Sequence, residues 1–222
     1  MLCSKCGEKI RPVVALDIDG VLGDYHGHFL RFATTYFGKD LEALLGMSVR
    51  KFDGSERFST YCCRELGITL ADYRECKLAY RQGGMKRSMP INQDATWICS
   101  MVQREAELWI TTTRPYLSLD GVIKDTLFWL ELHDIQMDGL LFDADKYAIL
   151  AEQVDPARVV AVLDDFDAGY DAAESIFGEH VPILYANGFN DWMKLDRNWC
   201  DSLRQAGNVI LDRAVDWSHE YA

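Results

Sequence analysis

Five short and nearly continuous apolar segments run through the chain, and they limit its fold more than any other feature. They occupy residues 13–16, 108–110, 139–142, 159–163 and 181–185. None of them alternates apolar with polar residues, as a half-exposed strand does. Uninterrupted apolar strands are typical of parallel sheets that helices cover on both faces. The segments therefore predict a parallel sheet of roughly five buried strands.

Amphipathic helical patterns separate the later strands. One apolar face is formed by Val122, Ile123, Thr126, Leu127 and Leu130, and another by Tyr170, Ala173, Ile176 and Phe177. Gly178 follows the second pattern, where a glycine commonly ends a helix. Because strands and helices alternate, we expect an α/β fold with a three-layer, Rossmann-like parallel sheet.

Residues 25–90 interrupt this alternation. Aromatic and apolar side chains recur at helical spacing from Phe29 to Phe37 and stop at Gly38, and a second helical pattern runs over residues 70–82. A further helix is expected over residues 92–104. We therefore expect residues 1–11 to form a short cysteine-containing segment, residues 12–24 and 91–222 to form the core, and residues 25–90 to form a helical cap inserted after the first strand.

Composition excludes several classes of protein. The chain has 222 residues, 49% of them hydrophobic, which is enough for a buried core. Its net charge of -12 repels polyanions and argues against polymeric nucleic acid as a partner. No apolar run approaches the roughly 20 residues of a membrane span, and the first residues lack a secretory pattern. A soluble, cytoplasmic protein with reduced thiols is expected, since the seven cysteines are odd in number.

Reactive side chains follow four of the apolar segments. Asp17 and Asp19 follow the first, three threonines (111–113) end the second, Lys146 comes after the third, and Asp164-Asp165 ends the fourth. Ligands of open α/β sheets bind beyond the carboxyl ends of the strands, so these groups should meet at one edge. Each alone has an ordinary explanation, because aspartates often end strands and cap helices. Together they predict a catalytic site.

This combination suits attack of a carboxylate on a phosphate ester. The carboxylate can form an aspartyl-phosphate and so divide one difficult displacement into two easier steps. Attack by one anion on another requires positive charge, which a divalent cation and a lysine can supply. Mg²⁺ takes oxygen ligands, including carboxylates. We therefore expect Mg²⁺ as the cofactor and a small phosphorylated molecule as the substrate.

The segment VVALDIDGVLGDY resembles the first motif of the haloacid dehalogenase (HAD) superfamily, and LWITTTRP, DADKY and VVAVLDDFD resemble the second, third and fourth. The resemblance implies that Asp17 is the nucleophile and that Asp19 is the general acid and base, with its backbone carbonyl on the metal. Asp17 and Asp164 would bind the metal through their carboxylates, and Asp165 beside them would be a further ligand or would lie just behind the ligands.

The same resemblance implies phosphate binding by Thr112, or alternatively by Thr113, and by Lys146. A helical cap at this place in the chain is most similar to the 5'(3')-deoxyribonucleotidase-like branch, which implies a nucleoside monophosphate as substrate. The alternatives are a phosphatase for nucleic-acid ends or sugar phosphates, and a non-catalytic module that binds a metal or a partner.

Four basic residues are expected to contact the substrate: Arg81, Lys86, Arg87 and Arg114.

Cys3 and Cys6 have the spacing of half a zinc knuckle, but no second pair of this kind exists in the chain. Zn²⁺ bound by these two thiols is one alternative. A vestigial knuckle, a redox pair and zinc shared between chains are the others.

The C-terminal segment carries Trp199, Leu203 and Ile210 and is either a packing helix or an interface. If it is an interface, the protein is expected to be a homodimer.

Overall fold

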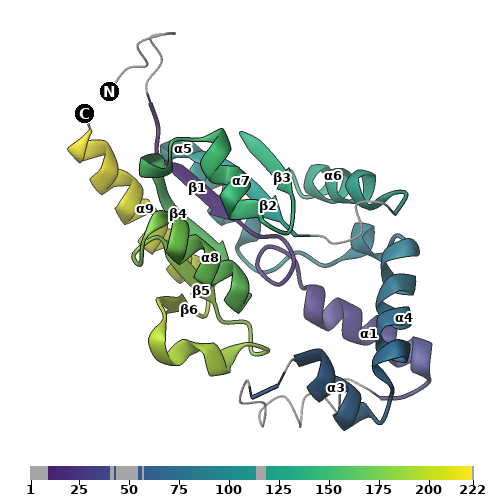
Figure 1. Cartoon of the computed structure of the whole chain (residues 1–222). Helices are drawn as coiled ribbons and strands as arrows, with labels where there is room; N and C mark the ends of the chain where they lie inside the picture. Colours follow the sequence, from purple (N-terminus) through teal and green to yellow (C-terminus); the bar gives the residue numbers. More distant parts are fainter. Residues whose placement is uncertain (1–9, 41–42, 44–54, 57, 114–118, 222) are drawn as a thin grey trace.

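All strands of the sheet run parallel, in the order β3-β2-β1-β4-β5-β6 (Figure 1). The computed structural model describes residues 10–40, 43, 55–56, 58–113 and 119–221. The strands are β1 (Val13–Leu16), β2 (Glu107–Thr112), β3 (Gly139–Phe142), β4 (Val159–Asp164), β5 (Pro182–Tyr185) and β6 (Trp199–Cys200). Side chains of β1 and β4 are buried at every position, as their continuous apolar sequences predict.

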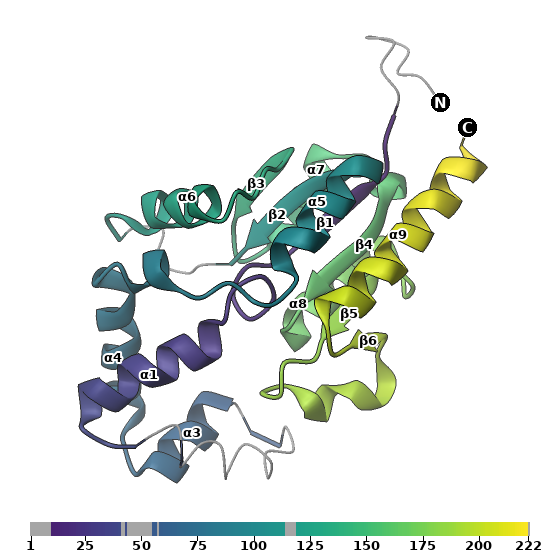
Figure 2. The same cartoon turned by 180° about the vertical axis from the view of Figure 1, so that it is seen from behind.

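Helices cover both faces of this sheet. The α-helices are α1 (Tyr25–Phe37), α3 (Phe58–Leu66), α4 (Leu70–Gln82), α5 (Ala95–Glu105), α6 (Val122–Leu132), α7 (Lys146–Gln153), α8 (Asp167–Phe177) and α9 (Leu203–Glu220). The 3-10 helices are η2 (Met85–Ser88), η3 (Pro156–Arg158) and η4 (Asp191–Asp196). Helices α7 and α8 lie on one face, and α5 and α9 lie on the other (Figure 2). The predicted three-layer α/β class is confirmed.

Two apolar clusters sandwich the sheet, and strand alternation decides which residue joins which. Val14 and Leu16 of β1 point to the α5 and α9 side, whereas Val13 and Ala15 point to the α7 and α8 side. Asp17, the next residue along, continues the second set. The alternation thus directs the side chain after β1 toward the face where α7 and α8 begin.

Strand order reverses between β1 and β4. From β1 the chain builds β2 and β3 toward one edge, and β4, β5 and β6 then continue toward the other. The connections on the two sides of such a switch point diverge, which leaves a crevice at the carboxyl ends of the two central strands. Asp17 follows β1 directly and Asp164 ends β4, so both stand at this crevice.

Helices α1, α3 and α4, which with η2 form the described part of the helical insertion, pack around an apolar cluster separate from those of the sheet. Phe29, Leu30, Cys62, Tyr73 and Tyr80 are among its buried members. Helix α1 ends at Gly38, whose φ of 60° is the left-handed conformation that glycine adopts easily. Helix α4 begins with a capping box, in which Thr69 and Asp72 each bond the other's backbone N–H. The helix ends predicted at Phe37 and Gln82 are confirmed.

Three details differ from the sequence expectations or add to them. The two-residue strand β6 is too short to leave an apolar pattern. Helix α5 begins at Ala95 rather than at Asn92, because the N–H and side chain of Asn92 instead bond the carbonyls of Leu22 and Val21. The C-terminal segment packs as helix α9, with Leu203, Ala206 and Ile210 buried against the sheet.

None of the helices in the described residues combines the length and apolarity that a bilayer crossing requires.

Candidate active site

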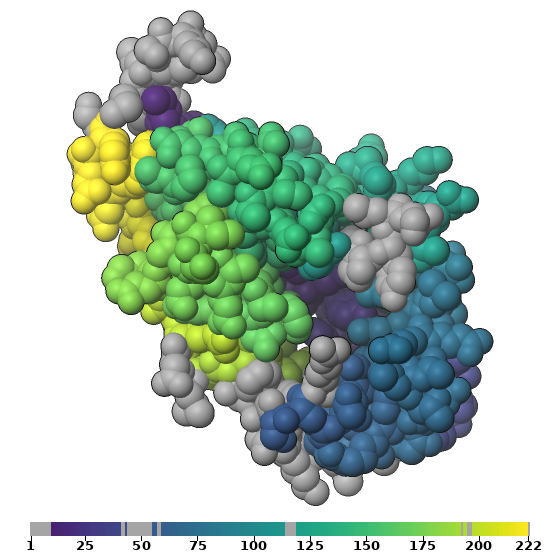
Figure 3. Space-filling view, viewed as in Figure 1, coloured from purple at the N-terminus to yellow at the C-terminus, as the bar shows by residue number. Residues whose placement is uncertain are grey.

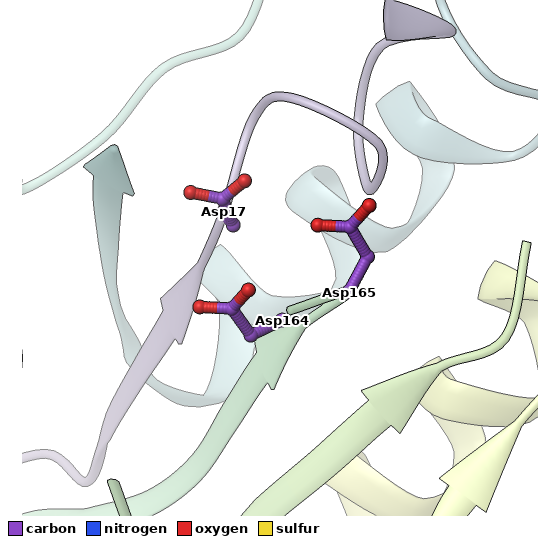
Figure 4. Close-up of side chains that lie close together, drawn as sticks. All are labelled: Asp17, Asp164 and Asp165. Atoms are coloured by element: carbon purple, nitrogen blue, oxygen red, sulfur yellow. The ribbon is translucent and has the colours of Figure 1, made fainter. Parts of the chain in front are cut away.

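Three aspartates converge at the crevice between β1 and β4 (Figure 4). One carboxylate oxygen from each of Asp17, Asp164 and Asp165 lies within 4.8 Å of the other two. The N–H of Asp17 donates to the carbonyl of Leu163 at 3.0 Å, which extends the pairing of β1 with β4 by one residue and fixes the first acid beside the others. We call these three residues the acid cluster.

Lys146 lies inside the acid cluster. Its Nζ is 2.6 Å from Oδ1 of Asp17 and 2.8 Å from Oδ2 of Asp164. The lysine comes from the first residue of α7, on the face to which Asp17 points. All three side chains are at most 6% exposed, so solvent screens their charges little. Burial lowers the pKa of Lys146, but the carboxylates of Asp164 and Asp17 outweigh it and raise that pKa well above its ordinary value.

Asp17 shows that the cluster holds more negative than positive charge. Burial, followed by the neighbouring carboxylates, raises the pKa of Asp17 to about 8, although Lys146 acts in the opposite direction. The positive charge of a single lysine therefore offsets only part of the cost of placing a charged carboxylate at this buried position. Carboxylate oxygens at this spacing are ligands that Mg²⁺ prefers, and a divalent cation would supply the missing positive charge. The residues present thus fit a divalent cation.

Asp164 is held by donors on both of its oxygens. The hydroxyl of Tyr147 donates to Oδ2 at 2.5 Å, and the N–H of Phe166 donates to Oδ1 at 3.0 Å. Gly169, in the first turns of α8, makes room for this carboxylate, since a Cβ there would lie 2.2 Å from Oδ2 of Asp164. Burial, followed by the charge of Asp164, raises the pKa of Tyr147 well above its ordinary value, so the phenol remains a neutral donor.

Asp165 is contacted by residues outside the acid cluster. Its Oδ2 accepts from the side chain of Asn187 at 2.8 Å and lies 2.9 Å from Nε2 of His26. Gly20 passes so close that a Cβ there would lie 1.9 Å from the same oxygen. With φ at 91°, Gly20 is also in a conformation that other residues rarely adopt. The turn after β1 therefore requires glycine in order to fit against Asp165.

Asp19 forms an ion pair with Lys86 of η2. The lysine is 4% exposed, and its Nζ lies 4.1 Å from the ring centroid of Tyr25, the first residue of α1. Asp19 itself keeps 22% of its side chain exposed. The helical insertion thus places a buried ammonium group at the carboxylate two residues beyond Asp17.

The threonines at the end of β2 supply hydroxyl groups near Asp17. Thr111 and Thr112 are buried, and within the described part of the chain neither hydroxyl has a hydrogen-bond partner. Buried hydroxyls without partners are costly, which suggests that a bound group completes them. Thr111 is level with Asp17 across the sheet, one position past the pair Ile110–Leu16, and Thr112 lies one residue farther toward the edge. Thr113 is exposed.

The four residues predicted to bind the substrate do not all lie near the acid cluster. Lys86 reaches Asp19, as described above. Arg81 is half-buried on α4, and its charge partly opposes the burial that raises the pKa of Tyr25 above its ordinary value. Arg87, a residue of η2, packs against α6 instead. Its guanidinium group is 3.7 Å from Asp125 and 4.3 Å from the ring centroid of Phe128, so the structure does not bring it to the acid cluster. Arg114 falls outside the described residues.

Two groups of residues remain, the N-terminal cysteines and the acids that precede Lys146. Cys3 and Cys6, and with them the predicted zinc, lie outside the described residues. Asp143 and Asp145, which stand just before Lys146 in the sequence, form a local turn in which Asp143 accepts from the N–H of Asp145 at 2.8 Å. Lys146 pairs with Asp17 and Asp164, and the described structure records no ion pair between it and these two nearer acids.

Three residues at the site were absent from the sequence-based assignment: Tyr147, His26 and Asn187. Tyr147 was detectable in principle, because it follows Lys146 directly on the same helix. His26 follows the first motif closely in the sequence, which places it near the site, but its contact with Asp165, 139 residues away, is visible only in the structure. The contact of Asn187 with Asp165, 22 residues away, left no signal in the sequence. Figure 3 shows part of the N-terminal region, in purple, at the bottom of a hollow between the green and the blue surfaces of the molecule.

No family model and no curated relative matches the chain. Solved structures do. The magnesium-bound YfnB of Bacillus subtilis has a TM-score of 0.59 at 12% identity, covering 91% of this chain and 99% of its own. A HAD hydrolase of family IA from Entamoeba histolytica gives 0.58 at 14%, covering 90% and 99%. A haloacid dehalogenase-like family hydrolase from Streptococcus pneumoniae gives 0.57 at 12%, covering 88% and 96%.

These likenesses span nearly the whole of both chains in each comparison. At such identities they establish architecture alone. The chain therefore has the fold of the HAD-like hydrolases, with the acid cluster at the switch point of its sheet.

Proposed function

We propose that this protein is a phosphomonoester hydrolase that uses Asp17 as its nucleophile and requires Mg²⁺. The observation that carries the proposal is the acid cluster, in which Asp17 lies against Lys146 and two further carboxylates at the topological switch point. A module that only binds a metal has no need of a lysine held 2.6 Å from one of its carboxylates.

The chemistry proceeds in two displacements. An oxygen of Asp17 bonds to phosphorus while the bond from phosphorus to the leaving oxygen breaks, and Asp19 transfers a proton to that oxygen. Asp19 then takes a proton from a water molecule whose oxygen bonds to phosphorus, and the bond between Asp17 and phosphorus breaks. Inorganic phosphate leaves, and both aspartates return to their starting states.

Positive charge and hydrogen-bond donors make these displacements feasible. Lys146 would stabilise the phosphoryl oxygens, with the hydroxyl of Thr112 donating a hydrogen bond to them. Mg²⁺, held by Asp17, Asp164 and the carbonyl of Asp19 with Asp165 beside them, would neutralise charge on the phosphoryl group when bound. Lys86 holds Asp19 close to the leaving group's side of the site.

The helical insertion would act as a cap over the core formed by residues 12–24 and 91–222. Its Lys86 pairs with Asp19, which is close to Asp17 in the chain, and its His26 contacts Asp165, which is next to Asp164. The insertion therefore contacts two carboxylates of the site. A cap in this position excludes water and contacts the leaving group. Unlike Lys86 and His26, which contact carboxylates of the site, Phe29 is 5% exposed and belongs to the insertion's own core.

A nucleoside monophosphate is the proposed substrate. The resemblance of the first motif and cap position to the deoxyribonucleotidase-like branch supports it, and so does an aromatic pair next to Asp165, where the rings of His26 and Phe189 stack at 4.8 Å. A sugar phosphate is the second candidate. The net charge of -12 disfavours a phosphatase for nucleic-acid ends.

A substrate panel tests the proposal. Phosphate release is measured from nucleoside monophosphates, sugar phosphates and 3'-phosphorylated oligonucleotides, with halide release from a 2-haloacid as the comparison. Each is assayed with Mg²⁺ and with EDTA, on the parent, on Asp17→Asn and on Asp216→Asn, an exposed acid of α9. We expect Mg²⁺-dependent release that only Asp17→Asn abolishes. Absence of release from every phosphate ester by folded, Mg²⁺-loaded protein would contradict the proposal.

A further inference from the structure

Asp164 is restrained more tightly than any other acid of the cluster. Its Oδ2 accepts from the hydroxyl of Tyr147 at 2.5 Å and from Nζ of Lys146 at 2.8 Å, and its Oδ1 accepts from the N–H of Phe166 at 3.0 Å. An ionised carboxylate offers about four lone-pair sites. Donors among the described residues thus occupy all but one of them, and the remaining site belongs to Oδ1.

Tyr147 is well placed to fix this arrangement. Its side chain is 2% exposed, and its ring packs with Ala15, Leu150 and Val162 in the apolar cluster beneath the acids. A ring held by such packing keeps its hydroxyl in one position. The phenol therefore sets the rotation of the Asp164 carboxylate, because Lys146 is shared with Asp17 and the Phe166 N–H reaches only the other oxygen.

We propose that Tyr147 is a positioning residue for the divalent cation: its hydroxyl holds Oδ2 of Asp164 so that the carboxylate binds the cation through Oδ1 alone. The inference rests on the proposed function only in that a cation occupies the acid cluster. Residues that hydrogen-bond to metal ligands typically change metal affinity or activity by about 10- to 100-fold when they are removed.

A cation-binding assay that needs no substrate tests this inference. Binding of Mn²⁺ is followed by electron paramagnetic resonance, with Mg²⁺ as competitor, for the parent, Tyr147→Phe and Tyr170→Phe. Tyr170 is the matched control, because it is also 2% exposed and its hydroxyl accepts from the N–H of Asn198 at 3.1 Å, away from the acids. We expect the Kd of Tyr147→Phe to rise about 10-fold or more, and that of Tyr170→Phe to match the parent.

Thermal unfolding in EDTA separates positioning from packing. Both phenylalanine variants keep the ring, so their Tm values without cation should be alike. Should Tyr147→Phe unfold, Tyr147→Met, which keeps apolar bulk and also lacks a donor, must show the same loss of cation affinity. In phosphatase assays, more Mg²⁺ should be needed for half-maximal rate, while the rate at saturating Mg²⁺ recovers toward that of the parent.

The outcomes for this inference and for the proposed function are distinguishable. Parent-like Mn²⁺ affinity in Tyr147→Phe would overturn the role of Tyr147, whatever the phosphatase result. Weakened binding in Tyr147→Phe together with no phosphate release by the parent would overturn the proposed reaction and leave the positioning role supported. A parent that binds no Mn²⁺ would overturn both.

Discussion

Lys86 of the helical insertion forms a partly buried ion pair with Asp19, two residues beyond Asp17 on the turn after β1. The ammonium group also lies 4.1 Å from the ring centroid of Tyr25. The ion pair holds the carboxylate that is proposed to exchange a proton with the leaving group, and the ring contact holds the ammonium group. In the proposed reaction the insertion would therefore contribute a charged group in addition to acting as the cap.

Replacement of Lys86 by methionine should lower kcat while the fold is retained. Methionine keeps the length and apolar contacts of the lysine stem but no longer fixes Asp19, and misplacement of a reacting group by about 1 Å can cost on the order of 10²-fold in rate. Steady-state kinetics on the preferred phosphate ester measure the effect. Lys124→Met, an exposed lysine of α6, is the control. Parent-like kcat in Lys86→Met would show that the pair has no role in the reaction.

Stability without cation should depend on pH through Asp17. The folded protein binds the Asp17 proton with a pKa of about 8, whereas the ordinary value is 3.8. Between these values the folded state holds more protons than the unfolded state, so rising pH favours unfolding. Asp17→Asn removes this titration. Its stability relative to the parent should therefore increase from pH 4 to pH 8 in denaturant titrations with EDTA. A difference that is independent of pH would contradict the raised pKa.

The two buried threonines of β2 should differ in importance. The phosphorus atom must lie beyond the Asp17 carboxylate, and Thr112 is one residue farther along β2 than the position level with Asp17. We expect Thr112→Val to lower kcat/KM by about 10²-fold, in the range found when a donor to the reacting group is lost, and Thr111→Val to have a smaller effect. Valine has a similar shape, so both variants should fold. A larger effect of Thr111→Val would exchange the two roles.

Gly169 should be required for the cation site rather than for the fold. An alanine Cβ would lie 2.2 Å from Oδ2 of Asp164 and would displace that carboxylate. The same change raises helix propensity by about 1 kcal/mol, which offsets part of the strain. Gly169→Ala should therefore lose cation affinity, measured with Mn²⁺, with little change in Tm. Ser175→Ala on the exposed side of α8 serves as control, and unchanged affinity in Gly169→Ala would show that Asp164 is not a ligand.

The sequence was sufficient to predict the sheet and the edge where the acids meet. Continuous apolar strands such as β1 and β4 report burial on both faces, and a residue that directly follows such a strand must lie at its carboxyl end. Asp17, Lys146 and Asp164 could therefore be assigned together from their order along the chain. Strand β6 was missed because two residues cannot show a period.

The remaining contacts depend on how separate elements pack, which no local pattern encodes. His26 meets Asp165 only because α1 begins beside the carboxyl end of β4, and Arg87 lies on α6 because of the packing of η2 against that helix. The spacing of Phe29 identified a helix face. Only the structure shows that this face is buried within the insertion itself.

The most direct test of the central claim is detection of the phosphoryl group on Asp17. The protein is mixed with its best phosphate ester and Mg²⁺, quenched in acid within one turnover, digested and analysed by mass spectrometry; Asp17→Asn and Asp216→Asn are treated in parallel. The account predicts a phosphorylated peptide containing Asp17, sensitive to hydroxylamine, in the parent and in Asp216→Asn, and none in Asp17→Asn. Phosphate release by Asp17→Asn at the parent's rate, or a phosphoryl group on another residue, would contradict it.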